Sequence, residues 1–246
     1  MCPILTFLKN IFHTSTFERL SLRQSARYTT MFRTKYTIIV SFLICFFGMA
    51  EAQNAGEWAL KNEKEGVKVY YRKTSDVYEL KLVTSIQSSV SGLIKLLSEV
   101  EHYPQWGYKV AESALLYQTS RTESVYYSKL DFPWPLDDRD IVMRNHVVQD
   151  PVSGKVTATS ISVPDFIPKK NGVTRIRNAN TTWEITPGKG GWLYVEYRIY
   201  SDPGGSLPDW LINMAIDIGP RETMNNIRAF VKQPTYQTAK LAHIRE

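Results

Sequence analysis

The residue types that carry covalent or metal chemistry are sparse in this sequence of 246 residues. After residue 52 the histidines are His102, His146 and His243, which are far apart. Zinc ligands come in closely spaced pairs, so this pattern predicts no metal site. The sequence also lacks a G-x-S-x-G nucleophile turn and a Walker phosphate loop, and the glycines at 188–191 are interpreted as a hairpin turn. We therefore expect a protein that is not an enzyme and uses no cofactor.

One segment has the features of a recognition element. Residues 125–142 read VYYSKLDFPWPLDDRDIV. Pro133 and Pro135 fix their own φ and disfavour helical geometry in the residues before them, so Trp134 is held on a rigid extended turn. Arg139 follows among three aspartates, and we expect it to pair with a carboxylate. A flat ring beside a charge cluster favours ligand recognition over catalysis.

The N-terminal part of the chain has the features of a processing signal. Met31 begins a short basic stretch, residues 37–49 are largely apolar, and residues 50–52 (AEA) fit a small-x-small cleavage pattern. The apolar stretch is shorter than the roughly 20 residues of a membrane span. We therefore predict a signal peptide over 31–52, cleaved near Ala52, and a secreted or periplasmic protein. Residues 1–30 are interpreted as an N-terminal extension that either results from a start codon assigned too far upstream (an over-called start) or is disordered, with an organelle transit peptide as the alternative.

Removal of this leader changes the charge and cysteine arguments. The chain has 30 basic and 24 acidic residues, of which residues 1–52 hold six and two, so residues 53–246 have 24 against 22 and a net charge of +2. A balanced charge gives no support to a nucleic-acid partner. Both cysteines, Cys2 and Cys45, lie in the leader. The 194 residues that remain are enough for one domain over 53–246.

Hydrophobic periodicity predicts a domain of strands and helices. Alternating patterns predict strands over residues 67–71, 78–86, 109–118, 124–131, 141–149, 155–163, 173–185 and 192–200. Helical spacing predicts a helix over 89–101 with Ser89 as its N-cap. A second helix is predicted over 208–232, with a kink or break at Gly219-Pro220. The strands would form a long curved antiparallel meander that grips the C-terminal helix.

A sheet curved around a helix encloses a volume between them. An apolar volume with a few polar anchors is the usual small-molecule site. Two polar pairs could lie in it, namely Arg139 with Asp140, and Glu196 with Arg198 on one face of the last strand. A buried ion pair would serve specificity more than stability. For Glu196 and Arg198 we favour the interpretation as a surface pair.

Two motifs resemble those of a known family. The block FPWPLDDRDIV at 132–142, and DPGGSLPDWLIN at 202–213, resemble the START lipid-transfer domain, particularly its phosphatidylcholine-transfer protein branch. Residues 103–106 and 162–168 lie at the matching places, and the resemblance covers residues 58–231. It implies an α+β helix-grip (START/Bet v 1-like) fold, in which a long curved antiparallel sheet around a C-terminal amphipathic helix encloses a hydrophobic tunnel for one lipid. We expect a bacterial secreted member.

The resemblance also implies a lid made of the aromatic turn and the C-terminal helix. Carried over to this chain, the lid is residues 134–138 with Trp210, Leu211 and Met214. The chain departs from the branch where charged neighbours of a tyrosine and a tryptophan help to hold the headgroup, because residues 104–105 and Gly107 are uncharged here. The sequence therefore leaves the lipid unidentified. The predicted tunnel and lid residues are Trp106, Tyr126, Trp134, Leu136, Arg139, Asp140, Trp183, Tyr194, Glu196, Arg198, Trp210, Leu211, Met214 and Ile218.

We therefore predict a non-enzymatic monomer that binds a single lipid or other apolar small molecule, contacts membranes transiently and binds no nucleic acid. Transfer of the lipid is a further expectation. One alternative is a cyclase-like helix-grip enzyme acting on a hydrophobic substrate. Another is an envelope protein-interaction domain whose aromatic residues form an external patch.

Overall fold

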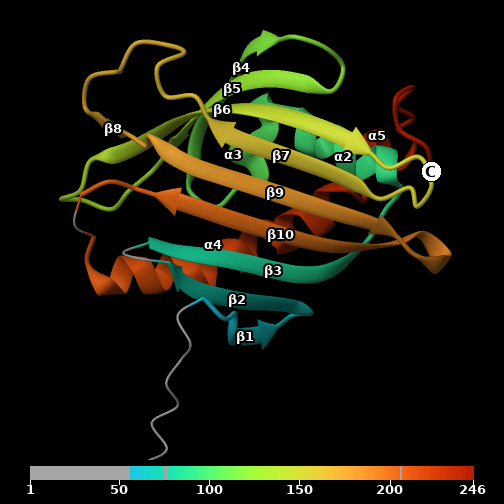
Figure 1. The fold of residues 1–246 in the computed structure, drawn as a ribbon, viewed down its shortest axis with the longest axis horizontal. Coiled ribbons are helices and arrows are strands. Elements are labelled where there is room, and N and C mark those ends of the chain that lie inside the picture. Colours follow the sequence, from blue (N-terminus) through green and yellow to red (C-terminus); the bar gives the residue numbers. More distant parts are fainter. Residues whose placement is uncertain (1–55, 75–76, 206) are drawn as a thin grey trace, which may run out of the picture. The chain divides into compact units, whose positions relative to one another are not determined.

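Ten strands in the described part of the chain form one curved sheet (Figure 1). The computed structural model describes residues 56–74, 77–205 and 207–246, so the predicted leader and both cysteines lie outside the described residues. The strands are β1 (Ala59–Lys64), β2 (Val67–Thr74), β3 (Val77–Gln87), β4 (Val110–Gln118), β5 (Glu123–Leu130), β6 (Asp138–Gln149), β7 (Val156–Ser162), β8 (Val173–Arg175), β9 (Asn178–Pro187) and β10 (Trp192–Asp202). Their order in the sheet is β1-β2-β3-β10-β9-β7-β6-β5-β4, with β8 attached to β6.

Six helical segments accompany the sheet in the described part of the chain. They are α2 (Val90–Ser98), η1 (Val100–His102), α3 (Tyr103–Trp106), η2 (Lys189–Gly191), α4 (Asp209–Phe230) and α5 (Pro234–Gln237). In Figure 1, α2, α3 and α4 lie on the same side of the curved sheet. The predicted helix-grip arrangement, an antiparallel sheet around a C-terminal helix, is confirmed.

The core lies between this side of the sheet and the helices. Alternation along β2 and β3 turns Val67, Val69 and Leu82 inward, and these side chains are almost fully buried. Helix α4 presents Met224 and Ile227 to the same core. Among the strands, α4 contacts mainly β1, β2 and β3, and the space between it and the concave face of the sheet forms the site described below.

Helix α2 is fixed at both ends by polar contacts. As predicted, Ser89 is its N-cap, because its hydroxyl accepts a hydrogen bond from the Gly92 amide at 3.0 Å. The Glu246 carboxylate accepts two more from the amides of Val90 and Ser91 at 2.9 and 3.0 Å. At the other end, the Tyr236 hydroxyl donates to Glu99 at 2.9 Å. The segment after α4 therefore holds α2 in place.

The predicted meander is confirmed from β4 to β10, apart from the short strand β8, but it is wrong at the step from β3 to β4. After β3 the chain leaves the sheet through α2, η1 and α3, and β10 takes the place beside β3. The run predicted over 173–185 is also two strands, because β8 turns away to pair in parallel with β6 before β9 begins. The prediction missed β1, which pairs with β2 across a two-residue turn with positive φ at Glu65 and Gly66.

Of the two alternatives predicted at Gly219-Pro220, a kink or a break, the break is wrong, because α4 continues through both residues. A proline removes only one helical hydrogen bond, and the turns on either side are held in the core by Ile216 and Met224. Gly219 instead allows the ring of Tyr108 to lie close to the backbone of α4. A Cβ atom at this position would lie 2.8 Å from Cδ1 of Tyr108.

Candidate functional site

An internal cavity of about 710 Å³ lies between the concave face of the sheet and the helices. Its walls come from the inward positions of β3, β5, β6, β7, β9 and β10 and from α2, α3 and α4. Most of the lining is apolar, with Leu80, Ile94, Met143 and Val147 as examples. A cavity of this volume is in the range of small-molecule sites.

Aromatic side chains form one wall of the cavity. The rings of Trp183 and Tyr197 stack with 3.8 Å between centroids, and Tyr103 contacts Trp106 and Tyr126 edge to face, at 4.7 and 5.5 Å. Burial raises the pKa of the Tyr126 hydroxyl to about 12 and that of the Tyr103 hydroxyl well above its usual range. These hydroxyls are therefore neutral at physiological pH and can take part in hydrogen bonds only as uncharged groups.

The floor of the cavity carries a small uncharged polar cluster. The Ser160 hydroxyl donates to Oδ1 of Asn145 at 3.1 Å, and both residues line the cavity together with Tyr126 and Thr181. Asn145 follows Ile141 and Met143 on the inward face of β6. Strand alternation therefore places an amide on a floor that is otherwise mostly apolar.

Charged groups are confined to the mouth of the cavity. Among the described residues that line it, the charged ones are Lys109, Asp131 and Asp202, and all three are exposed. Nζ of Lys109 lies 3.4 Å from Oδ2 of Asp131. A buried ion without a partner costs several kcal/mol, so the described interior is suited to an uncharged ligand or to the uncharged part of an amphiphile.

Two segments far apart in the sequence form the rim. Phe132 and Pro133, in the loop between β5 and β6, line the cavity, as do Pro203 and Leu207, in the segment before α4. Figure 1 shows both segments at the same end of the sheet. The first of these segments carries the cis peptide bond between Trp134 and Pro135.

Arg139 joins these two segments. It is 5% exposed, and it donates from Nε to the Pro203 carbonyl at 3.1 Å and from a terminal nitrogen to the Gly204 carbonyl at 3.3 Å. Another terminal nitrogen donates to the Asp137 carbonyl, and the guanidinium lies 4.7 Å from the centre of the Phe132 ring. The expectation that Arg139 pairs with a carboxylate is therefore wrong, because backbone carbonyls of both segments take its donors.

Asp140 pairs with Arg175 instead of Arg139. The two side chains are 0% and 1% exposed, and Nε and a terminal nitrogen of Arg175 donate to the two carboxylate oxygens at 2.7 and 2.8 Å. The hydrogen bond with Asp140 raises the pKa of Arg175. Arg175 also donates to the carbonyls of Pro164, Ile167 and Pro168. The pair lies outside the cavity lining and fastens the 163–172 loop to β6 and β8.

The structure distributes the predicted ligand contacts over five places. Five line the cavity, namely Trp106, Tyr126, Trp183, Leu211 and Met214. Trp134 and Leu136 belong to the β5–β6 loop of the rim, and Trp210 lies in the first turn of α4, just after the other rim segment. Arg139 and Asp140 lie outside the lining, and Ile218 is half-buried on α4 and is not among the lining residues. Tyr194, Glu196 and Arg198 lie on the outer face of β10, which corrects their placement in the tunnel. The reason is strand alternation, since Tyr197 and Ile199 occupy the inward positions.

The surface interpretation of Glu196 and Arg198 is confirmed. Nε of Arg198 donates to Glu196 at 2.6 Å, and the Arg198 side chain is 46% exposed. Sequence reasoning missed Tyr197, Asn145 and Ser160 as lining residues. Continued alternation from Met143 along β6 could have indicated Asn145. Tyr197 was missed because the prediction turned the opposite, polar face of β10 toward the ligand.

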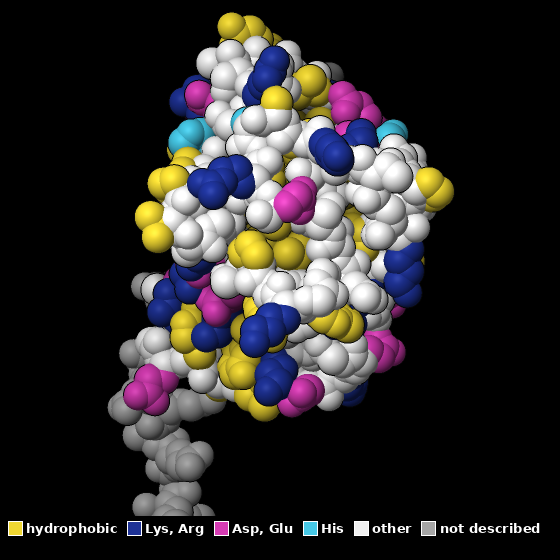
Figure 2. Space-filling model, turned by 90° about the vertical axis from the view of Figure 1, so that its right-hand side faces the viewer, with side chains coloured by type: hydrophobic (Ala, Val, Ile, Leu, Met, Phe, Trp, Pro, Cys, Tyr) yellow, Lys and Arg dark blue, Asp and Glu magenta, His cyan; other side chains and the backbone are white. Residues whose placement is uncertain are grey.

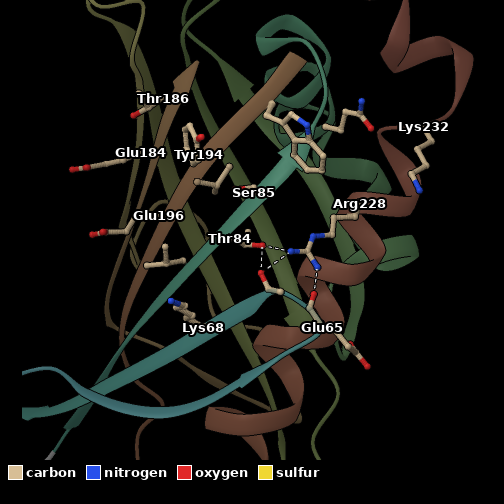
Figure 3. A pocket seen from close by; sticks show the side chains of 15 residues that line it. Glu65, Lys68, Thr84, Ser85, Glu184, Thr186, Tyr194, Glu196, Arg228 and Lys232 are labelled. Carbon is tan, nitrogen blue, oxygen red and sulfur yellow. Dashed lines mark hydrogen bonds between the residues drawn. The ribbon is translucent and has the colours of Figure 1, made fainter. Parts of the chain in front are cut away.

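A second hollow of about 810 Å³ lies on the outside of the molecule, beside β2, β3, β10 and the end of α4. In Figure 3, Arg228 and Lys232 lie on one side of it and Glu184 and Glu196 on the other. Arg228 points toward the hairpin turn (Figure 3) and donates to the carbonyls of Glu65 and Gly66 at 2.5 and 2.8 Å and to the Thr84 hydroxyl. Because its N–H groups are hydrogen-bonded to the β1–β2 turn, Arg228 stabilises that turn.

The surface at one end of the molecule mixes charges of both signs with apolar groups. Figure 2 shows hydrophobic side chains gathered in the middle and lower part of that face, with Lys, Arg, Asp and Glu side chains among them. A continuous basic stripe, which is typical of a nucleic-acid interface, is not seen on that face. Within residues 56–74, 77–205 and 207–246, no helix is long and apolar enough to cross a membrane, and no cluster of potential metal ligands occurs.

Comparison with known proteins finds one family and several relatives of the same kind. The model of the START domain matches residues 46–237. An uncharacterized protein of Pseudomonas aeruginosa is 32% identical over 186 residues, which is 74% of this chain and 91% of the relative. Phosphatidylcholine transfer protein of Rattus norvegicus is 30% identical over 178 residues, 68% of this chain and 80% of the relative.

Solved structures of lipid transfer proteins also resemble this chain. The STAR-related lipid transfer protein of Xanthomonas axonopodis (fragment 25–204) superposes with a TM-score of 0.65 at 30% identity, over 72% of this chain and 99% of that one. Human StAR-related lipid transfer protein 5 also gives 0.65, at 15% identity over 83% and 98% of the two chains. The human protein supports the fold alone.

Proposed function

This chain belongs to the START domain family, and we propose that it binds one lipid, or another hydrophobic molecule of similar size, in the internal cavity and transfers it between membranes. The observation that carries this proposal is the cavity itself, whose described interior is lined by apolar and uncharged polar side chains. Transfer of apolar ligand surface from water into such a site is favourable by about 25 cal/mol per Å². An acyl chain would therefore be retained until the cavity opens.

Entry and exit would take place at the rim. Trp134 is 91% exposed and follows Phe132 and Pro133, which line the cavity, and Trp210 is 53% exposed and precedes the lining residue Leu211. Tryptophan favours the interface between water and lipid. We propose that the two rings rest transiently in a membrane surface while the segments that carry them separate. The protein would do this as a monomer, with the signal peptide directing it outside the cytoplasm.

Binding without catalysis is the version of this function that the lining supports. The titratable groups of the described interior are tyrosines, and burial holds the pKa of Tyr126, Tyr103 and Tyr197 above the ordinary value of tyrosine. A general base works best with a pKa near the working pH. These hydroxyls stay protonated and are suited to hydrogen bonding with a ligand.

The test is to measure lipid content and lipid transfer on the purified protein. The protein is exposed to vesicles made from a total lipid extract, re-isolated, extracted with organic solvent and analysed by mass spectrometry, and transfer of a fluorescent acyl lipid between vesicles is followed in parallel. One bound apolar molecule per protein and accelerated transfer are expected. A protein that carries no apolar ligand would refute the proposal.

A cavity-filling variant makes this test specific. Ala158 is 5% exposed and lines the cavity, so Ala158→Phe should reduce bound lipid strongly. Ala114 is exposed on the edge strand β4, and Ala114→Phe is the matched control that should bind like the wild type. Overpacking costs about 1–3 kcal/mol, so circular dichroism must show that Ala158→Phe remains folded.

A further inference from the structure

The polar cluster on the cavity floor is the feature of the site that a purely apolar ligand leaves unused. Asn145 lies near the middle of β6, paired with Ser124 on β5 and with Ser160 on β7. Its Oδ1 atom accepts the Ser160 hydroxyl at 3.1 Å. This bond fixes the orientation of the amide, because one end of it is already occupied.

The other end of the amide is available inside the cavity. Among the described residues, no hydrogen bond engages Nδ2 of Asn145, and this atom is not among the buried polar atoms that lack a partner. Asn145 is half-buried and lines the cavity. Its Nδ2 therefore presents an oriented N–H donor to whatever occupies the cavity.

The position of Asn145 separates this donor from the charged mouth. It follows Arg139 by six residues along β6, which corresponds to about 20 Å at the rise of an antiparallel strand. The charged lining residues Lys109, Asp131 and Asp202 are exposed at the mouth. A ligand oxygen that reaches Asn145 must therefore lie in the part of the ligand that is buried, and burial of an unpaired ion there is unfavourable.

We propose that Asn145 recognises an uncharged carbonyl or ester oxygen in the buried part of the ligand, so that the cavity selects lipids that carry such a group there over pure hydrocarbons. This inference rests on the proposed function and names its ligand class. Ser160 is a positioning residue, because it holds the amide with Nδ2 directed toward the cavity. Tyr126 and Thr181 extend the same uncharged cluster.

The test compares two probes of similar shape that differ in the acceptor. Methyl decanoate and 1-undecene are titrated into the wild-type protein and Asn145→Leu, and the fluorescence of Trp106 and Trp183, which line the cavity, reports binding. A net uncharged hydrogen bond is worth a factor of about five in affinity. We expect Asn145→Leu to lose about fivefold in the preference for the ester, with 1-undecene bound as in the wild type, and Ser160→Ala to lose less.

Each other outcome has a defined meaning. An unchanged ester preference in Asn145→Leu, or an equal loss of affinity for both probes, would overturn the role of Asn145 while leaving lipid binding intact. If wild-type protein binds neither probe, the proposed function fails and this inference fails with it. A third probe, a single-chain phosphatidylcholine of the same chain length, carries its ester next to a charged headgroup that must stay at the mouth. Asn145→Leu should therefore weaken its binding less than that of methyl decanoate, and an equal loss would overturn the assignment of Asn145 to an acceptor in the buried part of the ligand.

Discussion

Replacement of Arg139 by methionine should accelerate release of a bound lipid. Methionine keeps much of the apolar stem but removes the donors that join the β5–β6 loop to the Pro203 and Gly204 carbonyls. If the mouth opens by separating these two segments, opening breaks both bonds in the wild type and neither in the variant. The closed state of Arg139→Met is therefore destabilised relative to the open state by the net free energy of these two bonds.

The size of the effect follows from the two distances. A hydrogen bond to a charged group contributes about 1.5–3 kcal/mol. The bond to Pro203 is 3.1 Å long and the bond to Gly204 is 3.3 Å, so we assign about 1.5 kcal/mol to the first and a fraction of that to the second. The sum of about 2 kcal/mol corresponds to a rise of about 30-fold in the open population.

The assay is stopped-flow dissociation of a pyrene-labelled acyl lipid from loaded protein into an excess of acceptor vesicles. The dissociation rate of Arg139→Met should exceed that of the wild type by up to about 30-fold. Arg177→Met is the matched control, because Arg177 is 52% exposed and pairs with the exposed Asp165. A rate for Arg139→Met within twofold of the wild type, in protein that denaturant unfolds more easily, would show that the mouth opens without separating these segments. Equal acceleration in Arg177→Met would also refute the reasoning.

Three further predictions concern the buried pair, a cavity tyrosine and the rim. Asp140→Asn should lower the free energy of unfolding by about 3–5 kcal/mol, because Arg175 is left buried with a weakened partner. Urea denaturation measures this loss. The double variant Asp140→Leu with Arg175→Met, which leaves no buried charge, should recover much of it. Since burial raises the pKa of Tyr126 to about 12, its contribution to stability is complete below the unfolded pKa of about 10 and declines as the pH rises toward 12. Between pH 8 and pH 11 the free energy of unfolding of the wild type should therefore fall by about 1.4 kcal/mol more than that of Tyr126→Phe. Urea titrations at the two pH values measure both changes, and equal changes in the two proteins would contradict this prediction. Trp134→Ala with Trp210→Ala should co-sediment less with vesicles and transfer lipid more slowly, while the lipid already bound in the cavity is retained; unchanged sedimentation would place the membrane contact elsewhere.

The fold could be predicted because local and global signals agree. Alternation identified β2, β3, β5, β6, β7 and β10 nearly at their observed bounds, and Ser89 marked the start of α2. The position of β10 beside β3 could not be predicted from periodicity, because alternation fixes which face of a strand is buried but says nothing of its neighbour. The single run over 173–185 hid the short strand β8, whose place is set by pairing with β6.

The site was predicted in part for the same reason. Large apolar and aromatic residues such as Trp106, Trp183 and Leu211 were assigned to the cavity from their type and from the resemblance, and the structure places them in its lining. The partner of Arg139 was predicted wrongly, because a charged side chain can reach several groups. Arg139 lies next to Asp140 in sequence, yet the two project to opposite sides of β6, and only the tertiary structure brings Arg175 to Asp140.

The contact between Gly219 and Tyr108 restricts how the C-terminal helix can move. A residue with a Cβ atom at this point would collide with the tyrosine ring, and the neighbours of Gly219 in α4 are Ile218 and Pro220. Sliding α4 along its axis by one residue, about 1.5 Å with a turn of about 100°, would bring one of these larger side chains against the ring. The contact at Gly219 therefore prevents α4 from sliding along its axis. We expect the cavity to open by an outward swing of the first half of α4 about this point, while the second half stays packed in the core.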